Sequence, residues 1–151
     1  MKKITSFTID HTRLFPGMYV SRQDYDVVTY DLRVKRPNGG DYMSDAEMHS
    51  FEHMFATYIR NSDIGENVIY FGPMGCATGF YLLTRDVENV TVLKYTLETL
   101  EKIIAHKGEV FGASEAECGN YRNLDLEAAK KVAIEYLSVL RNSVTDFKYR
   151  D

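Results

Sequence analysis

Two histidines and a glutamate form the group of residues in this sequence best suited to metal chemistry. The pentad His49-Ser50-Phe51-Glu52-His53 places two imidazoles four residues apart, with a carboxylate beside the second. On a helix, the two rings project from one face about 40° apart, so both can reach one metal ion. This His-x-x-Glu-His order is the inverted zincin pattern, in which the histidines bind the metal and the glutamate transfers protons.

A catalytic metal site commonly has three protein ligands and an open position, so the pentad needs another ligand from elsewhere in the chain. Cys118, Cys76, His11, His106 or a carboxylate could supply it. Cys118 is the best placed, because a Cys-Gly pair in a polar loop can bring a thiolate to the side of a helix. Two imidazoles and a thiolate suit Zn²⁺, Fe²⁺ or Co²⁺ better than Mg²⁺ or Ca²⁺. The alternative is that both pentad histidines are ordinary surface or interface residues.

Cys76 is the second candidate reactive group. It follows Gly72-Pro73-Met74-Gly75, where two glycines permit a tight turn that points the thiol into a cleft at a strand end. A thiol near a divalent cation loses its proton more readily and can shuttle protons near neutral pH. A buried, inert cysteine is an equally good interpretation of this local sequence.

The composition is that of an ordinary globular protein, with 44% apolar and 26% charged residues in 151. This length predicts one domain, residues 1–151, with a core that needs no disulfide or metal for stability. The net charge of −4 argues against nucleic acid binding, which needs a surplus of Lys and Arg on one surface.

The N-terminal residues include Lys2 and Lys3 but lack the apolar stretch, roughly 7–15 residues long, of a signal peptide. No segment approaches the ~20 apolar residues of a membrane span. We therefore expect a cytoplasmic protein with no membrane partner. Because thiols stay reduced in the cytoplasm, we expect Cys76 and Cys118 to be free rather than joined in a disulfide.

The periodicity of apolar residues predicts an α+β fold, a single domain in which helices pack against a mainly antiparallel sheet. Strands are expected at residues 4–9, 27–34, 68–71 and 78–83, and a turn at residues 37–40.

Three amphipathic helices are predicted. The first begins at Ser44, which forms a capping box with Glu47; the second extends from Asn89 to about His106; and the third is capped by Asp125. Apolar residues at 3.6-residue spacing are expected to face the core. In the three helices these are, in order, Met48, Phe51, Phe55, Tyr58 and Ile59; Leu93, Leu97, Leu100 and Ile104; and Leu126, Ala129, Val132, Ala133, Tyr136, Leu137 and Leu140.

Taken together, the residues resemble the S-ribosylhomocysteine lyase (LuxS) family over most of the chain. The resemblance depends on the order and spacing of several short motifs rather than on any one of them. These motifs are Ser6-Phe7, Asp10-His11, Asp31-Leu32-Arg33, the pentad followed by Ile59-Arg60, Pro73-Met74-Gly75-Cys76-Ala77-Thr78-Gly79-Phe80-Tyr81, Glu117-Cys118-Gly119 and Leu124-Asp125-Leu126-Glu127.

The resemblance implies a set of site residues. His49, His53 and Cys118 would hold the metal, which is Fe²⁺ in the family and can be replaced by Zn²⁺ or Co²⁺, with one ion per subunit. Glu52 and Cys76 would be the acid/base pair. Four further residues match family positions near the substrate: Ser6, His11, Arg33 and Arg60.

The family cleaves S-ribosylhomocysteine to homocysteine and 4,5-dihydroxy-2,3-pentanedione, the precursor of the autoinducer-2 quorum signal. The reaction moves a sugar carbonyl in successive steps and then eliminates the thioether, which links the family to methionine metabolism. Members act as homodimers with two sites at the subunit interface, each using groups from both chains. The resemblance therefore predicts a lyase and a homodimer.

One departure from the family lies just before the Cys76 turn. Members often carry Asp-Ile-Ser there, whereas this chain has Tyr70-Phe71-Gly72. A carboxylate expected near the amino group of the substrate is therefore absent.

Two other classes of protein fit parts of the pattern. An inverted-zincin metallopeptidase would use Glu52 to activate a metal-bound water for amide hydrolysis. A structural metal protein would close the site with a fourth protein ligand, such as Cys76.

Overall fold

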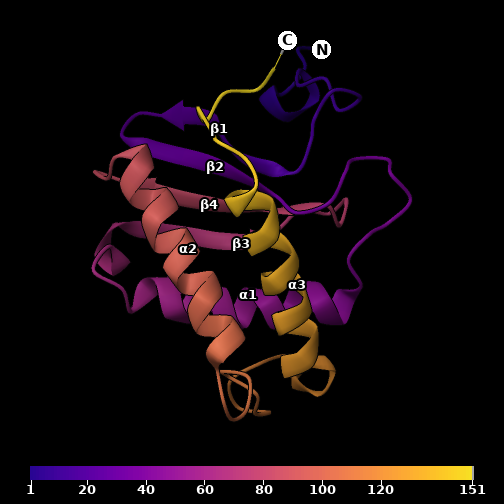
Figure 1. Ribbon diagram of the computed structural model, residues 1–151, viewed down its shortest axis with the longest axis vertical. Helices are drawn as coiled ribbons and strands as arrows, with labels where there is room; N and C mark the ends of the chain where they lie inside the picture. The colour runs from indigo at the N-terminus through magenta and orange to yellow at the C-terminus, as the bar shows by residue number, and fades with distance from the viewer. Residues whose placement is uncertain (151) are drawn as a thin grey trace.

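Four antiparallel strands form the sheet of the computed structural model, which describes residues 1–150 (Figure 1). Their spatial order is β1-β2-β4-β3, so β1 and β3 are the edge strands. The strands are β1 (Gly17–Asp24), β2 (Val27–Arg33), β3 (Val68–Pro73) and β4 (Gly79–Arg85). The last three confirm the strands predicted at residues 27–34, 68–71 and 78–83.

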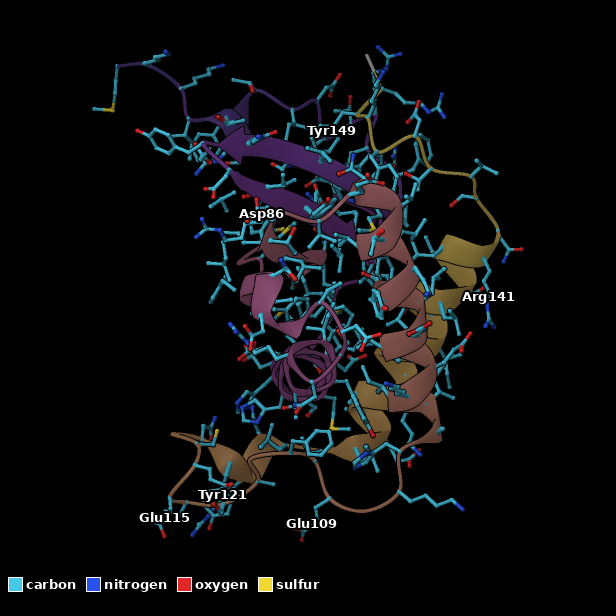
Figure 2. All side chains as sticks on the ribbon, turned by 90° about the vertical axis from the view of Figure 1, so that its left-hand side faces the viewer. Asp86, Glu109, Glu115, Tyr121, Arg141 and Tyr149 are labelled. Atoms are coloured by element: carbon cyan, nitrogen blue, oxygen red, sulfur yellow. The ribbon has the colours of Figure 1, made fainter. Side chains whose placement is uncertain are left out.

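Three helices pack against one face of this sheet and against one another (Figures 1 and 2). They are α1 (Asp45–Arg60), α2 (Asn89–Ala105) and α3 (Leu126–Arg141), and α1 contacts β3 while α3 contacts β1. Single 3-10 turns form at η1 (Thr5–Phe7), η2 (Gly65–Asn67) and η3 (Tyr121–Asn123). The predicted α+β fold is thus confirmed. Within residues 1–150, no helix combines the length and the apolar character needed to cross a bilayer.

Aromatic side chains from three elements form the centre of the core. Phe51 and Phe55 of α1 are fully buried against Phe71 of β3 and Phe80 of β4. The ring centroids of Phe55 and Phe71 are 4.3 Å apart, and those of Phe71 and Phe80 are 5.2 Å apart. This packing buries one side of α1. The flank of the helix that carries the pentad histidines therefore lies at the edge of the core.

Strand β2 is buried on both of its faces. Tyr30 and Leu32 point into the core below the helices, so Asp31 and Arg33, which alternate with them, lie on the opposite face. Asp31 and Arg33 are nonetheless only 1% and 2% exposed. They pair with each other and are covered by the turn before β4 and by the C-terminal tail.

The prediction of a strand at residues 4–9 is wrong. Thr5–Phe7 forms one 3-10 turn instead, and the Phe7 side chain is 70% exposed. The Asp10 carboxylate accepts hydrogen bonds from the backbone and the hydroxyl of Thr12, and such local bonds favour turns over strands. The first strand is β1, which the sequence did not reveal because its second half is polar and exposed.

The helix boundaries agree with the prediction, but the buried stripe of α2 is rotated from the predicted one. Leu100 is fully buried, whereas Leu93, Leu97 and Ile104 are only partly buried beside the core. Apolar residues cover much of α2, so their spacing alone does not identify its most buried line. That line consists of Val92, Thr96, Thr99, Leu100 and Ile103. In α3 the predicted face is buried, except that Leu126 is half-buried.

The start of α1 is the predicted capping box. The Ser44 hydroxyl accepts a hydrogen bond from the Glu47 backbone N–H at 3.1 Å, and the Glu47 carboxylate accepts one from the Ser44 backbone N–H at 3.0 Å. Burial acts to raise the pKa of Glu47, but these hydrogen bonds and Lys131 outweigh burial and lower it. The charged carboxylate therefore stabilises the fold above its ordinary pKa of 4.5, and this contribution is lost as the pH falls through its lowered pKa.

Replacement of Ser44 by alanine should lower the free energy of unfolding by about 1 kcal/mol, because one backbone donor of α1 loses its partner. Urea unfolding at neutral pH measures this loss. Ser143→Ala is the control. Ser143 follows the last residue of α3, and its hydroxyl donates to the Val139 carbonyl within that helix, so it does not cap the start of a helix. Equal losses in both variants would show that the capping box does not stabilise α1.

Candidate metal centre

Three potential metal ligands converge on the flank of α1. His49 and His53 lie one turn apart on the helix, and Cys118 comes from the loop that precedes η3. One ligand atom from each of the three lies within 4.8 Å of the other two. The His49 Nε2 atom is 3.4 Å from the Cys118 Sγ atom. Of the third ligands considered from the sequence, the tertiary structure brings Cys118 to the pentad.

Both histidine rings are oriented by hydrogen bonds at their Nδ1 atoms. His49 Nδ1 is 2.5 Å from the Asn123 side-chain oxygen, and His53 Nδ1 is 2.7 Å from the Phe111 carbonyl oxygen. Because both oxygens can only accept, each Nδ1 carries the proton and donates it. In the neutral imidazole, this tautomer leaves the Nε2 lone pair of each ring available for a metal.

The loop between α2 and α3 is shaped to fit around these ligands. Gly112 has a φ of 71°, and a Cβ atom on it would lie 3.1 Å from His53 Nδ1. The Asn120 backbone N–H donates to Cys118 Sγ at 3.4 Å and so helps to position the sulfur. The loop therefore both supplies one ligand and leaves room for another.

The donor set fits a divalent transition metal. Two imidazole nitrogens and one thiolate are half-buried, and three protein ligands would leave a tetrahedral ion one open position. Soft sulfur and borderline nitrogen donors suit Fe²⁺, Zn²⁺ or Co²⁺ rather than cations that prefer oxygen. The predicted site for a metal is therefore present, while its donors do not distinguish among these three ions.

Glu52 lies on the same flank of α1, three residues after His49 and next to His53. Its side chain is half-buried, and among residues 1–150 no hydrogen bond or ion pair is recorded for its carboxylate. A half-buried carboxylate that is not engaged in an ion pair can accept and return a proton beside a metal-bound ligand.

Cys76 lies in the turn between β3 and β4 and is exposed, which excludes the inert, buried interpretation. The turn differs in detail from the prediction, since the residue in the left-handed region is Ala77, with a φ of 61°, and neither Gly72 nor Gly75. Both cysteines are free thiols, as predicted. The Cys76 Sγ atom is 3.0 Å from the Thr78 hydroxyl oxygen.

A buried cation lies beside the Cys76 thiol. Arg33 Nη1 is 3.9 Å from Cys76 Sγ and donates a 2.7 Å hydrogen bond to Thr78 Oγ1. Burial alone would lower the pKa of Arg33, but the charge and hydrogen bonds of Asp31 raise it above its ordinary value. Arg33 is thus a permanent cation close to the Cys76 sulfur. His11 lines the same hollow, of about 230 Å³, as Cys76.

The two remaining predicted substrate residues lie elsewhere. Ser6 lines a separate hollow of about 430 Å³ together with Tyr70. Arg60 donates from its guanidinium to the backbone carbonyls of Val68 and Ile69, at 3.2 Å and 3.0 Å, and so ties α1 to β3. Roles for Ser6 and Arg60 toward a substrate stay predictions.

The departure at Tyr70-Phe71-Gly72 has a steric basis. The Tyr70 hydroxyl lies 2.1 Å from where a Cβ atom on Gly72 would stand. The Tyr70 ring therefore occupies the space that any side chain at position 72 would need. The tyrosine and the glycine depend on each other in this structure.

The metal triad and the Cys76 centre are separate within one chain. Arg33 reaches Cys76 from the face of β2 that points away from the helices, whereas the pentad belongs to α1 on the helix face. The hydrogen-bond partners of Cys76 and His11, and the hollow that these two residues share, include none of the three triad residues. The sequence predicts the residues of both centres but not this separation.

Three groups that support the site could not be predicted from the sequence: the Asn123 side chain, the Phe111 carbonyl and Gly112. They are distant in sequence from the pentad, and no local pattern relates them to it. The contact of Thr78 with Cys76 was also not predicted. A hydroxyl two residues after a cysteine in a tight turn is a local pattern that could have indicated it.

The fold and the site define an α+β protein with a group of two histidines and one cysteine that could hold a metal ion, and with a separate, exposed thiol. A family model described as S-Ribosylhomocysteinase (LuxS) matches residues 4–146. The chain belongs to this family.

Curated relatives agree with the family over nearly the whole chain. A protein of Finegoldia magna named S-ribosylhomocysteine lyase is 45% identical over 147 residues, which cover 94% of each chain. Relatives with the same name from Clostridium beijerinckii and Phocaeicola vulgatus are 43% and 42% identical. These two alignments cover 97% and 99% of this chain, and 96% and 97% of the relatives.

Replacement of Asn123 by alanine should weaken metal binding about 10-fold or more, because His49 loses the partner that orients its ring. Competition with a chelator against the zinc-loaded protein measures this affinity. Asn120→Ala is the matched control, since Asn120 contacts Cys118 through its backbone and not its side chain. An affinity unchanged by Asn123→Ala would show that this hydrogen bond does not orient the ligand.

Proposed function

We propose that this protein cleaves S-ribosylhomocysteine to homocysteine and 4,5-dihydroxy-2,3-pentanedione, the autoinducer-2 precursor. The observation that carries the proposal is the convergence of His49, His53 and Cys118 in a protein that also presents an exposed Cys76 thiol beside a buried arginine. The curated relatives named for this activity match 94% and 97% of the chain.

The reaction requires repeated proton transfers beside a carbonyl. As the carbonyl moves from C1 of the ribose to C2 and then to C3, each step removes one proton from carbon and returns one to a neighbouring atom. A bound divalent cation supplies Lewis acidity, which makes protons next to a carbonyl easier to remove. With the carbonyl at C3, the thioether at C5 is in the β position and leaves as homocysteine when a C4 proton is removed.

Glu52 and Cys76 are the two proton-transfer groups in this proposal. The Glu52 carboxylate stands beside the ligand histidines, and the Cys76 thiol is held near Arg33 and Thr78. Each exchanges protons between carbon and oxygen on its own side of the sugar. His11, in the hollow of Cys76, is placed to contact the sugar hydroxyls. The proposed reaction needs no oxidant and no organic cofactor.

The resident metal in our proposal is Fe²⁺, with Zn²⁺ and Co²⁺ as functional substitutes and one ion per subunit. The donor set supports all three ions, and the family resemblance favours iron. We place the reaction in the cytoplasm, where the two free cysteines stay reduced.

The active form in our proposal is a homodimer whose sites combine groups from both chains. The separation of the Cys76 centre from the triad within one chain supports this, because the reaction needs both centres around one sugar. A two-fold symmetric pair would bring the Cys76 turn of each chain to the triad of the other and make two identical sites. Ser6, Arg33 and Arg60 would contact the substrate in these shared sites.

Two alternatives make different predictions. A metallopeptidase would need Glu52 and the metal but not Cys76. A structural metal protein would need a fourth protein ligand, and within residues 1–150 only His49, His53 and Cys118 form a group of possible ligands. The spectrum of cobalt-loaded protein tests the second alternative, because an open site changes its spectrum when S-ribosylhomocysteine is added.

The two cysteines provide a matched pair of variants for the proposal. Cys76→Ala should lower the release of homocysteine by about 10²-fold or more and leave the metal content unchanged, because it removes a proton shuttle. Cys118→Ala should lose both metal and activity, because it removes a ligand. A thiol reagent measures homocysteine, and metal analysis gives the stoichiometry. Undiminished turnover by Cys76→Ala would exclude the lyase mechanism.

Mixed dimers test whether the sites are shared between chains. Cys76→Ala and His53→Ala, each inactive alone, should regain activity when co-expressed, because one of the two sites in each mixed dimer is intact. With random pairing, about a quarter of the wild-type activity is expected, since half of the dimers are mixed and each has one site. Continued inactivity of the co-expressed variants would place each complete site within a single chain.

A further inference from the structure

The C-terminal tail, residues 145–150, crosses the edge strand β1. The Thr145 hydroxyl donates to the Met18 carbonyl at 2.8 Å, and the Val20 backbone N–H donates to the Phe147 carbonyl at 2.8 Å. The Phe147 ring packs in the core on the helix side of the sheet. These contacts hold the tail against β1 on the way to its last residues.

Tyr149 lies on the other side of the sheet, where the tail has passed β1. Its ring stacks on Tyr19 with centroids 5.0 Å apart, and its hydroxyl donates a 2.7 Å hydrogen bond to Asp31 Oδ2. Figure 2 shows Tyr149 beside the strands and Tyr121, three residues after Cys118, at the opposite end of the molecule. Tyr149 is thus remote from the metal triad and close to the buried pair on β2.

An unbroken series of contacts leads from Tyr149 to the Cys76 thiol. Asp31 accepts hydrogen bonds from Arg33 Nε at 3.1 Å and from Arg33 Nη2 at 2.7 Å. The remaining Arg33 nitrogen, Nη1, donates to Thr78 Oγ1, which lies 3.0 Å from Cys76 Sγ. Since Asp31, Arg33 and Thr78 are each at most 2% exposed, water does not screen this series strongly.

The Tyr149 hydroxyl is protonated at neutral pH and acts as a donor. Burial is the largest cause of the raised pKa of Tyr149, and the neighbouring charge of Asp31 raises this pKa further. The hydroxyl therefore keeps its proton, and the Asp31 carboxylate keeps two kinds of donor, the guanidinium and the phenol.

We propose that Tyr149 is a positioning residue for Cys76, which acts by holding Asp31 so that Arg33 directs Nη1 at the Thr78 and Cys76 pair. The phenol satisfies the Asp31 oxygen and offsets part of its negative charge. Without the phenol, Asp31 Oδ2 keeps the hydrogen bond from Arg33 Nη2 but loses its second donor, and the negative potential of Asp31 at the Cys76 sulfur increases. Arg33 then favours the thiolate less. This proposal depends on the proposed function only for the catalytic role of Cys76.

Tyr149→Phe tests the proposal, with Tyr19→Phe as the matched control. Both variants keep the stacked pair of rings, but only Tyr149→Phe removes a donor to Asp31, because the Tyr19 hydroxyl donates to the Phe15 carbonyl. Full-length, metal-loaded protein is alkylated with iodoacetamide across a range of pH. Mass spectrometry of the Cys76 peptide gives its rate, and the Cys118 peptide is the internal reference.

We expect Tyr149→Phe to move the midpoint of the Cys76 profile to higher pH and to slow its alkylation about 3-fold at neutral pH, which corresponds to about half a pH unit. Tyr19→Phe should match the wild type. Equal profiles for all three proteins, or equal shifts in both variants, would overturn the proposal.

A third variant separates positioning from a general loosening of the fold. In a Thr78→Val background the hydrogen-bonded link through Thr78 is lost and only the 3.9 Å contact of Arg33 Nη1 with Cys76 Sγ remains, so Tyr149→Phe should have a smaller additional effect on the Cys76 profile. The same 3-fold slowing in both backgrounds would contradict the proposal. Alkylation needs no substrate, so these results are independent of whether homocysteine is released. A shifted profile in a protein without lyase activity would support the role of Tyr149 and reject the proposed function.

Discussion

The packing of α1 on the sheet is the constraint on which the metal centre depends. Phe51 and Phe55 are buried against β3 and β4, and this leaves only one orientation for the helix about its axis. His49 and His53 therefore lie on the flank, where the loop between α2 and α3 can reach them. Because that loop supplies Cys118 and the partners of both rings, the geometry of the ligands is set by core packing and completed by long-range contacts.

A buried ion pair has a comparable role at the second centre. Asp31 and Arg33 lie on the face of β2 opposite the helices and are almost fully buried. Burying such a pair is costly, and removal of one partner typically destabilises a protein by about 3–5 kcal/mol. Here the pair holds a guanidinium beside the exposed thiol of Cys76, which a surface arginine would do with less precision. Its contribution is therefore better understood as orientation than as stability.

The two centres lie apart within a chain whose proposed reaction needs both. This arrangement supports the shared, dimeric site that we propose. It also explains why the hollows of a single chain each contain only part of the predicted set: His11 with Cys76, and Ser6 with Tyr70. The Tyr70 ring over Gly72 marks the part of the site where this chain differs most from the family pattern.

Local patterns in the sequence determined the helices, three of the strands, the capping box at Ser44 and the reactive residues themselves, because periodicity, capping and the pentad are encoded by residues within a few positions of one another. They did not determine β1, whose polar half is recognisable as a strand only through its pairing with β2. Tertiary structure alone decided that Asn123 and the Phe111 carbonyl orient the ligand rings, and that Tyr149 contacts Asp31 across 118 positions of sequence. Such contacts depend on how the chain is packed, and no local preference of the residues involved specifies them.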